Sequence, residues 1–126
     1  MKHHLVAEVV IGGWRAGGGR QSGLAGSLLL GVPDGRGGLA YVGHVGTGFT
    51  DVMRADMAAR LKPLEQQASP FAGRVPVEDA RGGRWVRPAL VGEVHFSEWT
   101  VDGRLRHPSW RGLRTDVRPA DVLPIE

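Results

Sequence analysis

The order of the apolar stretches, with glycine-rich segments between them, limits the fold of this chain more than any other feature. Three such stretches come first, at about residues 4–14, 24–33 and 39–45, and each has the length and residue pattern of a β-strand. The connections at residues 15–23 and 34–38 are rich in glycine, as loops and turns are. We therefore predict a three-stranded antiparallel meander in the first third of the chain.

A helix is predicted after the third strand. Thr50 has the residue type and the place of an N-terminal cap, but the capping box should be incomplete because Met53 stands where Glu or Gln would complete it. Pro63 limits the regular helix to about Lys62. Apolar residues recur at helical spacing in this stretch, at Met53, Met57, Leu61 and Leu64.

Two more strands are predicted in the second half of the chain. Residues 65–84 have an irregular pattern, in which Phe71 and Val75 would pin the segment to the core. A strand is predicted at residues 88–99, and Leu105 is expected to begin a short fifth strand. Three strands, a helix and two strands predict an all-β protein with one helix. This is the order of an OB-fold, a five-stranded Greek-key barrel whose helix lies between strands 3 and 4.

The length and composition fit one small domain. We expect residues 1–126 to form a single OB-fold, with an irregular basic tail at residues 108–126. The chain has no cysteine, which excludes disulfides and thiolate zinc sites. No apolar run approaches the roughly 20 residues of a membrane span, and no secretory signal pattern is present. We expect a cytoplasmic, monomeric protein without a membrane partner or a metal site.

Arginine dominates the basic residues. Of the 16 Lys and Arg residues only Lys2 and Lys62 are lysines, a bias that high genomic GC content would also produce. Arginine presents a planar fork of donors that suits phosphate groups. The segment at residues 104–118 holds five arginines, Trp110 and a single carboxylate. A solvated charged end would not leave a tryptophan in water, so we favour a phosphate-binding edge anchored by a buried Trp110.

Two other sequence patterns give little support for a nucleotide, metal or catalytic site. The segment GHVGTG at residues 43–48 lies between a strand and the helix but matches neither phosphate-loop pattern, so we favour a close backbone crossing over a nucleotide loop. The five histidines are scattered, with no pair spaced for zinc. His95 and Glu93 share a face of their predicted strand, but neither has an evident catalytic partner.

Four segments in order carry a family resemblance. They are EVVIGGW at residues 8–14, GSLLLGVP at 26–33, GHVGTGF at 43–49 and PSWRGLR at 108–114. Together they resemble the C-terminal OB domain of bacterial ATP-dependent DNA ligases, in particular the ligase module of the end-joining ligase D group. The resemblance covers nearly the whole chain and implies the OB-fold predicted above.

The resemblance also implies a partner domain. In this family the OB domain follows an adenylation domain that carries the nucleophilic lysine, so this fragment alone is expected to be inactive. Lys2 falls where the family has the last lysine of motif V, which contacts the α-phosphate of ATP or of the lysyl-AMP. Because Met1 directly precedes Lys2, we expect that the chain was cut from a longer protein at this boundary. The full enzyme would use ATP and Mg²⁺, with neither bound by this domain alone.

The last implied catalytic residues match motif VI, an R-x-D-K run. Arg114 and Asp116 occupy its first and third positions, Val117 replaces its lysine, and Arg118 comes one residue late. The resemblance implies that Arg114 and Asp116 orient the pyrophosphate leaving group when the domain closes on the adenylation domain. A hinge near Lys2 would then let the domain swing onto DNA.

Nicked duplex DNA is the second implied partner, held by contacts to phosphates that do not depend on sequence. Trp14 and Trp99 are either stacking groups or core residues, and we favour the core. Two other functions stay open: a free-standing OB-fold that binds single-stranded nucleic acid, and a protein-interaction barrel whose arginines serve solubility. The arginines expected to touch DNA are Arg15, Arg20, Arg104, Arg106 and Arg111.

Overall fold

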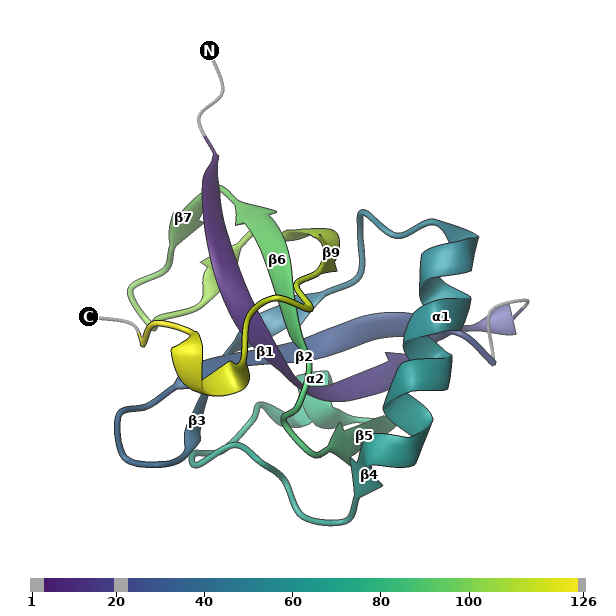
Figure 1. Cartoon of the computed structure of the whole chain (residues 1–126), viewed down its shortest axis with the longest axis horizontal. Coiled ribbons are helices and arrows are strands. Elements are labelled where there is room, and N and C mark those ends of the chain that lie inside the picture. The colour runs from purple at the N-terminus through teal and green to yellow at the C-terminus, as the bar shows by residue number, and fades with distance from the viewer. Residues whose placement is uncertain (1–3, 20–22, 125–126) are drawn as a thin grey trace.

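The computed structural model describes residues 4–19 and 23–124, in which a barrel of strands packs against one long helix, α1 (Figure 1). This mostly-β architecture confirms the predicted OB-fold. The helices are α1 (Asp51–Leu61) and α2 (Val77–Ala80), with short 3₁₀ helices η2 (Lys62–Leu64) and η3 (Pro119–Asp121). The strands are β1 (Leu5–Ala16), β2 (Ala25–Pro33), β3 (Leu39–Val45), β4 (Glu65–Gln66), β5 (Gly83–Val86), β6 (Val91–Phe96), β7 (Glu98–Trp99), β8 (Leu105–Arg106) and β9 (Ser109–Leu113).

The long strand β1 organises the sheet. Along one edge it pairs antiparallel with β2, and along the other edge its first half pairs with β6 and its second half with β5. Residues 9–14 are all buried, which agrees with the apolar side chains that the sequence places on both faces of the strand. A register shift between Ile11 and Gly13 marks the point where β1 passes from one partner to the other.

The barrel closes through β9, which pairs with β6 and meets the end of β3. The Trp110 N–H donates to the Thr47 carbonyl at 2.9 Å, and the Thr47 hydroxyl donates to the Pro108 carbonyl at 3.1 Å. The Trp110 ring is 2% exposed and stacks on Phe49 with their centroids 5.4 Å apart. The predicted burial of Trp110 is therefore confirmed.

Two glycines make room for this tryptophan. A Cβ at Gly92 would overlap the Trp110 indole ring, and a Cβ at Gly48 would overlap the Trp110 backbone. Gly48 also has a φ of +90°, a conformation that L side chains rarely adopt. The contact agrees with the close backbone crossing predicted for residues 43–48.

The prediction that residues 65–84 are irregular is wrong. They contain β4, α2 and the start of β5, and they lie against β1 and β2, where Phe71 fills the space that side chains at Gly12 and Gly31 would take. Phe71 and Val75 are 6% and 8% exposed, so their predicted role as pins to the core is confirmed. The sequence pattern hides β5 because that strand is four residues long and begins at a glycine pair.

The strand predicted at residues 88–99 is two strands, because Ser97 separates β6 from β7. Leu105 does begin a strand, but this strand, β8, pairs with β7 in a separate hairpin. The fifth barrel strand is β9, which lies inside the tail predicted as irregular. Its apolar signal is short because Ser109, Arg111 and Gly112 interrupt it.

The helix α1 lies where the sequence predicts it. The Thr50 hydroxyl accepts from the Met53 N–H at 3.1 Å, and the Met53 sulfur accepts from the Thr50 N–H at 3.4 Å. The prediction of an incomplete capping box is therefore wrong, because a thioether sulfur takes the acceptor place of Glu or Gln. The helix buries Met57, Ala58 and Leu61. No helix in the described part of the chain is long and apolar enough to span a membrane.

Candidate functional site

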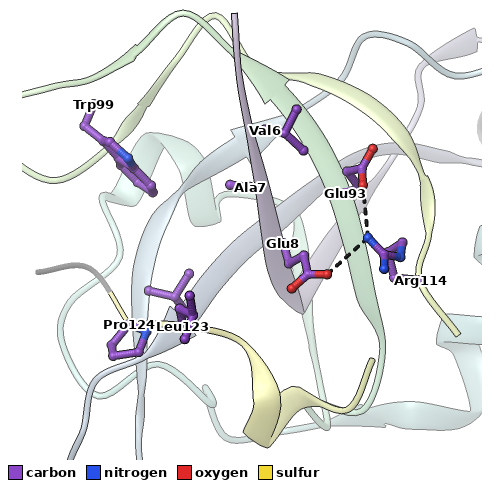
Figure 2. Close-up of a pocket in the computed structure, with 9 residues that line it drawn as sticks. Val6, Ala7, Glu8, Glu93, Trp99, Arg114, Leu123 and Pro124 are labelled. Carbon is purple, nitrogen blue, oxygen red and sulfur yellow. Dashed lines mark hydrogen bonds and ion pairs between the residues drawn. The ribbon is translucent and has the colours of Figure 1, made fainter. Parts of the chain in front are cut away.

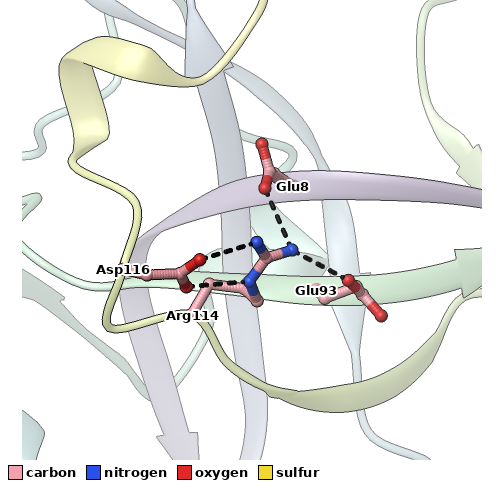
Figure 3. Close-up of polar contacts among 4 residues, drawn as sticks. All are labelled: Glu8, Glu93, Arg114 and Asp116. Carbon is pink, nitrogen blue, oxygen red and sulfur yellow. Dashed lines mark hydrogen bonds and ion pairs between the residues drawn. The ribbon is translucent and has the colours of Figure 1, made fainter.

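Arg114 is the centre of an ion cluster with Glu8, Glu93 and Asp116 (Figure 3). Its Nε and Nη2 atoms donate to the two carboxylate oxygens of Asp116, each at 3.0 Å. Its Nη1 atom lies 3.1 Å from Glu93 Oε1 and 3.1 Å from Glu8 Oε2. One guanidinium thus contacts three carboxylates, and the two-pronged contact with Asp116 fixes its plane.

Three strands place the members of the ion cluster. Glu8 in β1 and Glu93 in β6 lie directly opposite each other in the antiparallel ladder. Arg114 follows the last residue of β9, and its backbone N–H donates to the Val91 carbonyl at 2.8 Å. Like charges at opposed positions destabilise a sheet. The guanidinium between the two glutamates offsets their repulsion, which explains how the sheet accommodates both.

The contact between Arg114 and Asp116 stabilises the charged form of each. Hydrogen bonding from Arg114 lowers the pKa of Asp116 below its ordinary value. Hydrogen bonding to Asp116 raises the pKa of Arg114. The pair is therefore an ion pair at neutral pH.

A cavity of about 570 Å³ opens beside the ion cluster (Figure 2). Glu8, Glu93 and Arg114 form its polar side. The Arg114 side chain is 33% exposed, so solvent and ligands reach it without unfolding of the strands. The remaining walls are mostly apolar and come from Val6, Ala7, Val32, Trp99, Leu123 and Pro124.

The structure brings together Arg114 and Asp116, the two residues predicted from the motif VI resemblance. Arg118 does not join them, because its Nε donates to Asp121 at 3.2 Å and its side chain is 83% exposed. Val117, which replaces the motif lysine, packs partly buried against the core. Lys2, the third predicted catalytic residue, lies outside the described residues.

Arg104, one of the arginines predicted to contact DNA, is held by the protein itself. Its guanidinium lies 5.0 Å from the centre of the Tyr41 ring and donates to the Tyr41 carbonyl at 3.0 Å. The Tyr41 hydroxyl in turn donates to Asp79 at 2.9 Å. Burial, reinforced by this hydrogen bond, raises the pKa of Tyr41. Arg104 therefore has a structural role in addition to any contact with DNA.

The other arginines predicted to contact DNA differ in availability. Arg111 is exposed in β9, and Arg15 is half-buried near the end of β1. Arg106 is exposed and lies 3.8 Å from Glu98, a loose ion pair that a phosphate could replace at little cost. Arg20 lies outside the described residues.

The aromatic side chains lie mainly in the core. Trp14 is 3% exposed and donates from its indole nitrogen to Glu65 at 3.1 Å, while Trp99 packs half-buried against Phe96. The core interpretation is confirmed for Trp14, whereas Trp99 is only half-buried and also lines the cavity beside Arg114. The aromatic residues with less than a tenth of their surface exposed are Trp14, Tyr41, Phe71, Phe96 and Trp110. Among residues 4–19 and 23–124, no three His, Cys, Asp or Glu side chains are grouped to hold a metal ion.

Sequence reasoning missed Glu8 and Glu93 as partners of Arg114, and it missed Arg54. The Arg54 guanidinium donates to the carbonyls of Ala25, Gly26 and Gly46 at 2.7–3.0 Å and thereby ties α1 to the ends of β2 and β3. No local pattern points to Arg54, because its acceptors are backbone atoms distant in sequence. Glu8 did carry a signal, since it is the one charged residue between Leu5 and Trp14 of β1.

These features agree with a family comparison. The family model of the ATP dependent DNA ligase C terminal region matches residues 21–117, and the chain belongs to this family. The multifunctional non-homologous end joining DNA repair protein LigD of Mycobacterium tuberculosis is 54% identical over 123 residues, which cover 97% of this chain and 16% of that protein. LigD of Mycolicibacterium smegmatis is 58% identical over 117 residues, covering 92% and 15%. The chain thus spans about one sixth of the length of these relatives.

Solved structures give the same assignment. The ligase domain of M. tuberculosis LigD has a TM-score of 0.91 to this structure at 51% identity, and the match covers 98% of this chain and 40% of that chain. Mycobacterial DNA ligase D complexed with ATP and MES has a TM-score of 0.86 at 50% identity, covering 98% and 39%. A Lig E DNA ligase at 22% identity has a TM-score of 0.53 and shares the fold.

Proposed function

We propose that this chain is the OB-fold part of an ATP-dependent DNA ligase for end-joining repair, and that Arg114 and Asp116 serve its first chemical step. The observation that carries the proposal is the two-pronged contact between these two residues at motif VI positions. In that step a lysine of the adenylation domain attacks the α-phosphate of ATP, forms lysyl-AMP and releases pyrophosphate. A planar, fully charged guanidinium suits the alignment of this leaving group.

The proposed cycle requires two positions of this domain. In the first, the domain closes on the adenylation domain, with Arg114 near the polyphosphate of ATP and Lys2 near its α-phosphate. In the second, the domain has rotated about a hinge near Lys2 and rests on nicked duplex DNA. AMP then passes to the 5′-phosphate of the nick, and the 3′-hydroxyl attacks that phosphate and expels AMP.

The DNA-facing surface is proposed to consist of arginines that contact phosphates. Exposed Arg106 and Arg111 are the most available of them, and half-buried Arg15 is next. Arg104 would contribute while held on Tyr41, and Arg20 belongs to the same proposed surface. Contacts of this kind carry no sequence preference, as a ligase requires.

Several further statements belong to the same proposal. The chain acts as one domain, residues 1–126, and as a monomer in the bacterial cytoplasm, in association with the nucleoid. ATP and Mg²⁺ serve the whole enzyme and are bound together with the adenylation domain. The chain alone forms no lysyl-AMP, which incubation with labelled ATP followed by denaturing electrophoresis would check.

The catalytic part is tested in the longer ligase that contains this chain. Arg114→Ala and Asp116→Asn variants are compared in two assays: formation of lysyl-AMP from ATP, and sealing of a nick that already carries AMP. We expect the first reaction to slow by about 100-fold or more in Arg114→Ala, because one aligned charge is lost from the transition state. Sealing of the adenylylated nick should stay within about twofold. Unchanged lysyl-AMP formation would contradict the role of Arg114.

The DNA-binding part is tested by titrating the 126-residue chain with nicked duplex and with single-stranded DNA at two salt concentrations. Preference for the duplex and a steep salt dependence are expected. Arg111→Ala should reduce the salt slope by about one phosphate contact, whereas Arg60→Ala, which removes an arginine paired with Asp56, is the matched control. Stronger binding of single strands would favour the single-strand-binding alternative, and no binding at low salt would contradict both.

A further inference from the structure

We propose that Glu8 and Glu93 are positioning residues that hold Arg114 in a resting place, from which the polyphosphate of ATP withdraws it when lysyl-AMP is formed. The inference rests on the role of Arg114 proposed above. It adds to that role two residues on strands β1 and β6, far in sequence from the motif VI run.

The first argument is the use of the Arg114 donors. A guanidinium has five N–H groups. The Nε N–H group and one Nη2 N–H group donate to Asp116. The Nη1 atom, with its two N–H groups, lies beside both Glu8 and Glu93. Recognition of a phosphate group by an arginine fork takes two adjacent N–H groups. As placed here, Arg114 can offer such a pair to pyrophosphate only after it has left at least one carboxylate.

The second argument is charge. Three formal negative charges surround the single positive charge of Arg114. A polyphosphate that approached this arrangement would meet net repulsion, since its own negative charges lie close to those of the glutamates. The arrangement therefore suits an Arg114 that is waiting and not one that is bound to its ligand.

The third argument is which groups can move together. Asp116 lies two residues from Arg114 in a segment beyond β9, so it can travel with the arginine. Glu8 and Glu93 lie in the middle of six consecutive residue pairs between β1 and β6, so their backbone stays fixed. The adjacent cavity gives the Arg114 side chain room to swing away (Figure 2). The glutamates therefore act as a fixed acceptor and Arg114 as the moving part.

The sheet itself does not require two acids at these positions. Glutamines at positions 8 and 93 would keep the side-chain length and avoid the repulsion of opposed like charges. Two carboxylates do one thing that two amides cannot, which is to hold a guanidinium by charge. The two acids thus serve Arg114 and not the ladder.

The test uses the longer ligase that contains this chain, with Glu93→Gln, Glu8→Gln and the double variant. A weaker resting contact leaves Arg114 easier to withdraw, so each single variant should lower the KM for ATP in lysyl-AMP formation by about 2- to 5-fold, the usual range for one partly exposed ion pair. The KM for inorganic pyrophosphate in the reverse reaction should fall in the same proportion. The rate of sealing an adenylylated nick should not change.

Glu78→Gln is the matched control, because it makes the same chemical change on an exposed residue of α2. Thermal melting of each variant separates a loss of folding from a kinetic effect, and a lower KM for ATP cannot arise from loss of folding. An unchanged or raised KM in Glu93→Gln and Glu8→Gln would overturn the inference. If Arg114→Ala blocks lysyl-AMP formation while the glutamine variants match Glu78→Gln, only the inference fails; if Arg114→Ala has no effect, the proposed function fails too.

Discussion

Replacing Gly92 by alanine tests the packing that positions β9 and, through it, Arg114. Gly92 faces the indole of Trp110, and a Cβ at this position would overlap the six-membered part of the ring. Trp110 has little freedom to retreat, since it is 2% exposed and stacked on Phe49 at an interplanar angle of 12°. The added methyl group must therefore either strain the core or expel the ring.

The two responses differ in cost. Overpacking of a filled core costs about 1–3 kcal/mol. Expelling the indole would expose roughly 200 Å² of apolar surface at about 25 cal/mol/Å², or about 5 kcal/mol. Strain is the cheaper response, so we expect Gly92→Ala to lower the free energy of unfolding by about 2–3 kcal/mol. For a domain of this size that corresponds to a decrease in Tm of roughly 8–12 °C.

Urea unfolding followed by circular dichroism gives the free energy, and a double-mutant cycle identifies the cause. Trp110→Phe removes the ring atoms that the new methyl group would overlap. Gly92→Ala should therefore cost at least about 1 kcal/mol less in the Trp110→Phe background than alone. Gly73→Ala, at an exposed position with open space around it, is the control and should change stability by less than about 0.5 kcal/mol. A loss of stability in Gly92→Ala no larger than that in Gly73→Ala would refute the reasoning. Strictly additive effects of Gly92→Ala and Trp110→Phe in the double variant would also refute it.

Two further predictions concern polar contacts. Arg54→Met leaves the three carbonyls that the guanidinium serves without that donor and should cost about 1–3 kcal/mol in urea unfolding; a loss below about 0.5 kcal/mol would show that water replaces the arginine. Asp116 has a folded pKa below its ordinary value of 3.8, so its stabilising contribution is fully present above that ordinary, unfolded value and is lost as the pH falls through the lowered folded pKa. Asp116→Asn should therefore reduce the drop in Tm between neutral and strongly acidic pH, and identical pH profiles would contradict this assignment.

The sequence predicts the first half of the fold well because each element there has a clear local sequence pattern. Long apolar runs separated by glycine-rich turns predict β1, β2 and β3, and Thr50 marks the start of α1. The second half is harder since β5, β8 and β9 are two to five residues long and contain glycine, arginine or serine. Such strands are stabilised by their partners in the sheet, which a local pattern cannot reveal.

The site residues also fall into two groups, those that a local sequence pattern predicts and those that only the fold brings together. The resemblance to ligase motif VI points to Arg114 and Asp116 because the motif is contiguous, and the structure places them in contact. Glu8 and Glu93 become visible only when the register of β1 and β6 is known, since about 85 residues separate them in the chain. The sequence predicts Arg104 only as a DNA contact, because its partner Tyr41 lies in β3, 63 residues away in the chain.

The sharing of β1 by two partners along one edge has a consequence for how the domain opens. Its first half completes the barrel with β6, and its second half carries β5 together with the segment that Phe71 pins in place. Neither part can lose β1 without depriving the other of its neighbour, so the barrel and the attached layer should exchange their amide hydrogens as one cooperative unit. The slowest hydrogen exchange is expected at the amides of Val9, Val10 and Ile11. The fastest exchange within strands is expected in the hairpin of β7 and β8, in which each strand is two residues long. In the proposed cycle, the domain would in this way move as a single stiff body.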